Sequence, residues 1–176
     1  MFVLRCGLNF LICCLLTFYC LPSKSHAQSI RSGQSIMDGT SWTNIEFSAS
    51  QVNLQNGTSL KPVLQISCAS KHDASIYFQP GLVETAHDGS VMLRMKLDNS
   101  KPQRRKWIQQ TDPTIFEYRG DGDWVGMYIE QKFLKDLMNT TNLYIEFQPV
   151  QTDYAVTVTF HLQGLQKAFR AHSECR

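Results

Sequence analysis

The chain has 176 residues, with 17 lysines and arginines against 15 acidic residues and a formal net charge of +2. Hydrophobic residues make up 43% of the sequence and charged residues 18%, which is typical of a globular protein and unlike a disordered chain. The weak net charge argues against binding nucleic acid or anionic lipid by bulk electrostatic attraction.

The N-terminus has the pattern of a secretory signal peptide. A positive charge precedes an uncharged apolar run from Leu8 to Leu21, which is as long as a signal-peptide core but short for a membrane span. Ser25 and Ala27 then supply the small residues that signal peptidase requires. We therefore predict cleavage after Ala27, so that residues 1–27 form the signal peptide.

Two alternatives for this N-terminal segment are weaker. An uncleaved membrane anchor would need a longer apolar run of about 20 residues. A lipoprotein would be modified at Cys20, but the bulky Tyr19 stands where a small residue is expected. No later segment approaches the length of a membrane span.

Removal of the signal peptide changes the charge and cysteine counts. About 149 residues remain, which is a usual length for one domain, and 15 basic residues balance 15 acidic ones. The remaining cysteines are Cys68 and Cys175. Because compartments outside the cytoplasm are oxidising, we expect these two to form a disulfide. A thiol metal or redox site is the alternative, but it lacks a C-x-x-C pair or a neighbouring His/Cys cluster.

The first half of the mature chain reads as a lead-in followed by strands. Residues 28–41 are rich in Ser, Gly and Gln and predict a flexible lead-in, so we place a single domain at 42–176. Alternation of apolar and polar residues then predicts strands around 45–47, 52–54, 60–68 and 76–78. Asn56-Gly57 predicts a hairpin, because both residues tolerate a positive φ.

Residues 91–97 are the clearest half-buried strand. The residues expected to face inward are Val91, Leu93, Met95 and Leu97, and those expected to face outward are Met92, Arg94 and Lys96. We expect residues 98–106 to form a loop, with Trp107 opening another extended segment. A strand at 115–118 and a turn at 119–123 follow.

The period changes in the last third of the chain. Apolar residues at helical spacing predict a helix over 127–138, and strands are predicted at 143–147 and 154–162. A final helix over 165–172 leads to Cys175. The predicted fold class is mainly β (α+β): an antiparallel sandwich or curved sheet with two helices, one of them C-terminal, closed by one disulfide.

No motif points to catalysis, a cofactor or a metal. The mature histidines lack metal-ligand spacing; they are His72, His87, His161 and His172. There is no G-x-S-x-G motif and no Gly-rich phosphate loop. Five carboxylates are candidates for a hydrolase pair, namely Asp112, Glu117, Asp121, Asp123 and Glu130, but their spacing does not pair any two. We expect no enzymatic activity, no cofactor and no metal site.

A locally basic run precedes Trp107. Its members are Lys101, Arg104, Arg105 and Lys106. This run has two interpretations: it binds an anionic polymer or a lipid head group with Trp107 as a stacking platform, or it is a solvated loop balanced by acids elsewhere. We favour the solvated loop.

Several short segments share a family pattern. They are Met92–Asp98 with Trp107 and Thr111-Asp112, Phe116 with the helical segment 133–137, residues 158–168 with Cys175, and Trp42 with Ile66-Ser67-Cys68. Together they span residues 42 to 175 and resemble the VasI/TagO family of periplasmic accessory proteins associated with bacterial type VI secretion. The resemblance implies a β-rich periplasmic protein without enzymatic activity, with Cys68 and Cys175 paired. An acidic pair near residues 48–52 and a Gly-Trp ending, both associated with the family, are absent.

We therefore expect an exported, non-enzymatic accessory or binding protein in the periplasm or secreted, whose partner is an envelope or secretion-system protein. The candidate binding residues are Arg94, Asp98, Trp107 and Asp112. Arg94 and Asp98 also fit a structural ion pair. Two other functions remain open: an inhibitor or effector that inserts the turn from Gly120 to Trp124 into a cell-wall hydrolase, and a phage or host-interaction protein on the same scaffold.

Overall fold

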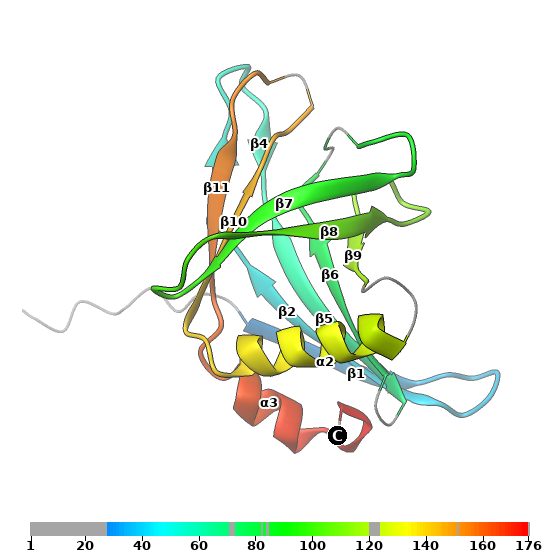
Figure 1. Cartoon of the computed structure of the whole chain (residues 1–176). Helices are drawn as coiled ribbons and strands as arrows, with labels where there is room; N and C mark the ends of the chain where they lie inside the picture. Colours follow the sequence, from blue (N-terminus) through cyan, green and yellow to red (C-terminus); the bar gives the residue numbers. More distant parts are fainter. Residues whose placement is uncertain are drawn as a thin grey trace, which may run out of the picture.

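A computed structural model describes residues 28–70, 73–81, 83, 85–119, 124–150 and 152–175 (Figure 1). The predicted signal peptide, residues 1–27, lies outside the described residues, as does most of the 119–123 turn. None of the described helices combines the length and apolar character needed to cross a membrane.

Strands are the predominant secondary structure of the described chain. The strands are β1 (Gln28–Gln34), β2 (Ser41–Ser48), β3 (Val52–Asn53), β4 (Ser59–Leu60), β5 (Val63–Ser70), β6 (Asp73–Gln79), β7 (Ser90–Leu97), β8 (Gln103–Gln109), β9 (Phe116–Tyr118), β10 (Asn142–Phe147) and β11 (Val156–His161). The helices are α2 (Trp124–Met138) and α3 (Leu165–Ala171), and a short 3-10 helix, η2 (Ser173–Cys175), follows α3.

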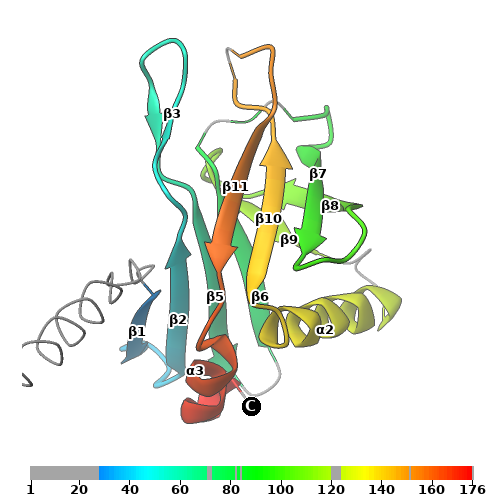
Figure 2. The same ribbon diagram turned by 90° about the vertical axis from the view of Figure 1, so that its left-hand side faces the viewer.

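Nine strands form one antiparallel sheet in the order β1-β2-β5-β6-β9-β8-β7-β10-β11, while β3 and β4 form a separate hairpin. The sheet is strongly curved and folds back on itself, so that β11 contacts β2 and the β10–β11 pair crosses β5 and β6 (Figure 2). This confirms the predicted curved antiparallel sheet with two helices. The Asn56-Gly57 hairpin is also confirmed, with Val52 opposite Leu60 and Gly57 at a φ of 83°.

The concave side of the sheet holds the core. Along β2 and β10 every second residue is buried, as the alternating pattern predicts for strands with one face covered. Phe78 lies at the centre and makes edge-to-face contacts with Trp107, Phe147 and Phe160. The aromatic cluster therefore joins β6, β8, β10 and β11 across the folded sheet.

Two helices cover one end of the curved sheet (Figures 1 and 2). Phe133, Leu134 and Leu137 give α2 a buried face at helical spacing. Gly164 adopts a φ of 93° before α3, a conformation that favours glycine, and Leu165 and Ala168 of α3 are buried. Both predicted helices are confirmed.

The disulfide joins Cys68 of β5 to Cys175 of η2, with the two Cα atoms 5.1 Å apart. Both cysteines are buried. The bond confirms the predicted pairing and ties η2 to β5, the third strand from the β1 edge of the sheet, across a sequence separation of 107 residues.

The flexible lead-in predicted for residues 28–41 was wrong, because residues 28–34 form β1. All seven residues of β1 pair with β2, from Gln28 opposite Phe47 to Gln34 opposite Ser41. Ser29 and Arg31 also contact the carboxylate of Glu46. As an edge strand whose side chains are mostly exposed, β1 has the polar composition that disordered segments share.

Candidate binding face on strands β7 and β10

The four predicted binding residues do not come together. Arg94 lies on the outer face of β7, and Asp98 lies in the turn between β7 and β8. Asp112 lies in an exposed turn beyond the far end of β8. The seven residues of β8 separate these two turns by roughly 20 Å at the usual rise of a strand.

Trp107 cannot act as a stacking platform, and this prediction was wrong. Its side chain is 0% exposed. Trp107 pairs with Val91 across β7 and β8 and packs against the rings of Phe78 and Tyr118. It belongs to the core, where its large apolar surface stabilises the fold. The loop predicted for the basic run was also wrong for Arg104, Arg105 and Lys106, which lie in β8, whereas Lys101 does lie before the strand.

Asp98 stabilises a turn. It has a φ of 41°, and its carboxylate accepts hydrogen bonds from the backbone N–H groups of Thr141 (3.1 Å) and Asn142 (2.8 Å). These bonds, that from Thr141 first, lower the pKa of Asp98 below its ordinary value because they favour the charged form. Arg94 pairs with Glu146 at 3.2 Å, so the predicted Arg94–Asp98 ion pair was wrong.

Asp112 has a local role. Its carboxylate accepts hydrogen bonds from the hydroxyl (2.7 Å) and the backbone N–H (2.9 Å) of Thr114. The Thr114 hydroxyl is the larger cause of the lowered pKa of Asp112. This arrangement defines the β8–β9 turn.

The outer surface of β7 and β10 does bring polar side chains together. We define the β7–β10 face as Arg94 and Lys96 of β7, Tyr144 and Glu146 of β10, and Thr157 of the adjacent strand β11. Lys96 lies opposite Tyr144, with its ammonium nitrogen 5.4 Å from the ring centroid, and Arg94 lies opposite Glu146. These residues, with Pro102 and Met95, line a hollow of about 210 Å³. Sequence reasoning found Arg94 but missed Tyr144 and Glu146, because β7 and β10 are far apart in sequence.

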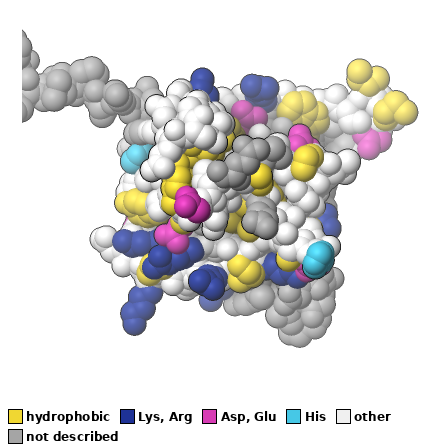
Figure 3. Space-filling model, turned by 90° about the horizontal axis from the view of Figure 1, so that it is seen from above, with side chains coloured by type: hydrophobic (Ala, Val, Ile, Leu, Met, Phe, Trp, Pro, Cys, Tyr) yellow, Lys and Arg dark blue, Asp and Glu magenta, His cyan; other side chains and the backbone are white. Residues whose placement is uncertain are grey.

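Further cations lie beside this face. Arg104 is opposite Arg94, and Lys106 is opposite Met92, which is 55% exposed. Lys106 pairs with Asp88 at 3.0 Å. The Ser90 hydroxyl and then Lys106 lower the pKa of Asp88 to about 2. Seen from above in Figure 3, Lys and Arg side chains gather along the lower edge, the side on which β7 and β8 lie.

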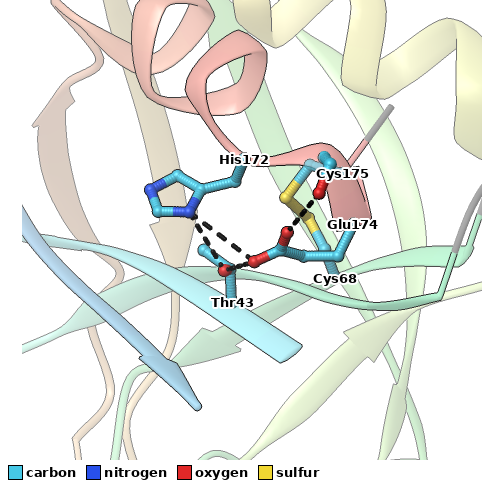
Figure 4. The surroundings of a disulfide bond; sticks show 6 residues. Thr43, Cys68, His172, Glu174 and Cys175 are labelled. Atoms are coloured by element: carbon cyan, nitrogen blue, oxygen red, sulfur yellow. Dashed lines mark hydrogen bonds and ion pairs between the residues drawn. A yellow bond between two sulfur atoms is a disulfide. The ribbon is translucent and has the colours of Figure 1, made fainter. Parts of the chain in front are cut away.

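A second polar cluster surrounds the disulfide (Figure 4). The Thr43 hydroxyl donates a hydrogen bond to the carboxylate of Glu174, and this bond is the main cause of the lowered pKa of Glu174. His172 Nδ1 lies 3.3 Å from Thr43 Oγ1 and 3.6 Å from Glu174 Oε1. Both partners approach the same ring nitrogen, whereas a catalytic triad places its nucleophile and its acid on opposite nitrogens. The cluster therefore joins the chain end to β2.

Among the described residues, no two of the carboxylates considered as a catalytic pair for a hydrolase are seen to interact. Glu117 is buried, accepting hydrogen bonds from Arg119 Nε (2.6 Å) and Gln110 Nε2 (3.0 Å). Glu130 lies on α2, while Asp121 and Asp123 lie outside the described residues. No group of three or more His, Cys, Asp or Glu side chains within the described ranges is arranged to hold a metal ion.

Comparison of the chain with protein-family models, with curated proteins and with solved structures returned no match.

Proposed function

We propose that the protein is an exported, non-enzymatic accessory protein of the bacterial envelope, similar in role to the VasI/TagO proteins of type VI secretion. It binds an envelope or secretion-system protein through the β7–β10 face. The support for export is the signal-peptide pattern of residues 1–27 together with the buried Cys68–Cys175 disulfide, which persists in an oxidising compartment.

The observation that carries the binding role is the composition of the β7–β10 face. Paired charges (Arg94 and Glu146) and a cation held over an aromatic ring (Lys96 and Tyr144) surround a shallow hollow. Arginine, tyrosine and methionine are enriched at protein interfaces, and Met92 is exposed on the same surface. The paired strands fix the backbone positions from which these side chains extend, which limits the backbone entropy lost on binding.

Site-specific photocrosslinking tests both parts of the proposal in the source cell. A photoreactive amino acid replaces Met92 beside the face, and a matched control replaces the exposed Lys167 on α3. We expect an adduct from position 92 that mass spectrometry identifies as an envelope or secretion-system protein. Mutation of Tyr144 to Ala should remove this adduct.

The same samples report the location of the protein. We expect it in the periplasm or the medium with Gln28 as its first residue. Retention of residues 1–27, or equal crosslinking from positions 92 and 167, would contradict the proposal. Adducts with a cell-wall hydrolase would favour the inhibitor function instead.

A further inference from the structure

A cleft lies on the other side of the β7–β8 hairpin, between the concave surface of the hairpin and α2. It has a volume of about 340 Å³, near the lower end of the range for small-molecule sites, about 300–1,000 Å³. The lining residues are Met95, Leu97, Ser100, Lys101, Gln103, Arg105, Phe133, Asp136, Asn139 and Thr140. In Figures 1 and 2, α2 runs below β7 and β8.

Arg105 is the central polar group of the cleft. It lies opposite Leu93, which is buried, so its side chain is on the inner face of β8, whereas the neighbouring Arg104 lies opposite the exposed Arg94. The guanidinium donates to the hydroxyl of Tyr118 at 2.7 Å and to Gln103 Oε1 at 3.0 Å. It also lies over the ring of Phe133, 4.7 Å from the centroid.

These contacts orient the guanidinium without neutralising its charge. Both hydrogen-bond acceptors are uncharged, and none of the ion pairs among the described residues involves Arg105. An oriented guanidinium presents a planar set of N–H donors that matches the two oxygens of a carboxylate. Lys101 adds a second cation to the lining.

The other residues that line the cleft indicate the chemical character of the part of the ligand beyond its carboxylate. Met95, Leu97 and Phe133 are apolar, while Asn139 and Thr140 lie at the end of α2. Asp136 shares the cleft and would repel a doubly charged phosphate more strongly than a singly charged carboxylate. The volume admits a small molecule and excludes a folded domain.

We propose that this cleft binds a small carboxylate whose apolar body packs on Met95 and Phe133 while its carboxylate pairs with Arg105. Met95 contributes to the lining of both this cleft and the hollow on the β7–β10 face, whereas Arg105 and Phe133 line only the cleft. The inference does not depend on the proposed function.

The test is an NMR titration of the purified, disulfide-bonded protein with N-acetylleucine. N-acetylleucinamide, which has the same apolar body but no carboxylate, and inorganic phosphate serve as comparison probes. We expect saturable shifts at Met95, Gln103, Arg105 and Phe133 with N-acetylleucine only, at concentrations up to about 20 mM. Arg105→Met should weaken binding about tenfold or more. Arg104→Met removes the same charge from the opposite face and should leave binding unchanged.

A second variant covers the case in which Arg105→Met fails to fold. Gln103 is exposed at the start of β8, so Gln103→Tyr should narrow the cleft without disturbing the core and should abolish the shifts. The proposal would be overturned if N-acetylleucine gave no saturable shifts, if the amide bound equally well, or if phosphate bound more tightly. It would also be overturned if folded Arg105→Met or Gln103→Tyr bound N-acetylleucine as the wild-type protein does.

Discussion

Thr43 on β2 and Glu174 in η2 are 131 residues apart in sequence, yet the Thr43 hydroxyl donates a hydrogen bond to the Glu174 carboxylate beside the Cys68–Cys175 disulfide. Thr43 is 0% exposed. The covalent bond and the hydrogen bond therefore attach η2 to two neighbouring strands, β5 and β2. Because η2 contacts both strands, it is part of the folded domain.

Replacing both cysteines with alanine should destabilise the protein strongly. The disulfide closes a sequence separation of 107 residues, for which the chain-entropy treatment gives a loss of about 4.7 kcal/mol in the free energy of unfolding. Urea denaturation of the double variant and of the oxidised wild-type protein measures the loss. Wild-type protein under reducing conditions is the control and should resemble the variant. Equal midpoints for the variant and the oxidised protein would show that the bond contributes little.

Glu174→Gln should reduce the dependence of stability on pH. Because the Thr43 hydrogen bond lowers the folded-state pKa of Glu174, its contribution to stability is present above the unfolded pKa. The contribution is lost as the pH falls through the folded pKa. Wild-type protein should therefore melt at a higher temperature than the variant at pH 6, and the difference should shrink as the pH is lowered below about 4.3, the ordinary pKa of a glutamate side chain. Thermal melts measure both proteins at each pH.

Asp153→Asn is the matched control for that experiment. Asp153 is exposed, and no hydrogen bond or ion pair to its carboxylate is seen within the described part of the chain. This variant should follow the wild-type melting curve at every pH. A constant difference between wild-type protein and Glu174→Gln over the whole pH range would mean that the carboxylate charge does not stabilise the chain end.

The strand pattern of β7 shows how far local sequence information reaches. Its alternation correctly predicted that Leu93 and Met95 face inward and Arg94 faces outward. Successive side chains of a strand point to opposite faces, so the apolar ones are those that face the core. The Cys68–Cys175 pair was also predictable, since only two cysteines remain after the predicted cleavage. The pairing of β7 with β10 was not, because it joins segments separated by β8, β9 and α2.

The strand β8 was missed because its charges resemble those of a loop. Its signal was nevertheless present: Gln103, Arg105 and Trp107 have the period of two that places them on one face. An inward arginine breaks the usual apolar alternation. The Arg105 guanidinium is stabilised by a hydrogen bond to Tyr118 and by its position over the Phe133 ring. Both partners come from other segments of the chain, so these contacts could not be assigned from sequence.

Asp98→Ala, in the turn between β7 and β8, should lower the free energy of unfolding by about 1–2 kcal/mol. The substitution removes the acceptor for the backbone N–H groups of Thr141 and Asn142 and puts alanine at a positive φ. Asp98→Asn keeps an acceptor oxygen and tolerates that φ, so its loss should be smaller. Chemical denaturation of both variants gives the comparison. If the asparagine variant lost as much stability as the alanine variant, the negative charge would be the important feature.

Gly33→Ala tests whether β1 packs as an ordered strand. A Cβ atom at Gly33 would lie 2.7 Å from Cζ2 of the Trp42 ring, so the ring has to move. We expect a changed tryptophan emission spectrum because the ring is displaced. The loss in the free energy of unfolding should stay below about 1 kcal/mol, since Gly33 is exposed and Trp42 is only partly buried. Ser32→Ala, at the exposed neighbouring position, is the control and should leave both measurements unchanged. If residues 28–34 were a flexible lead-in, Gly33→Ala would also change neither measurement.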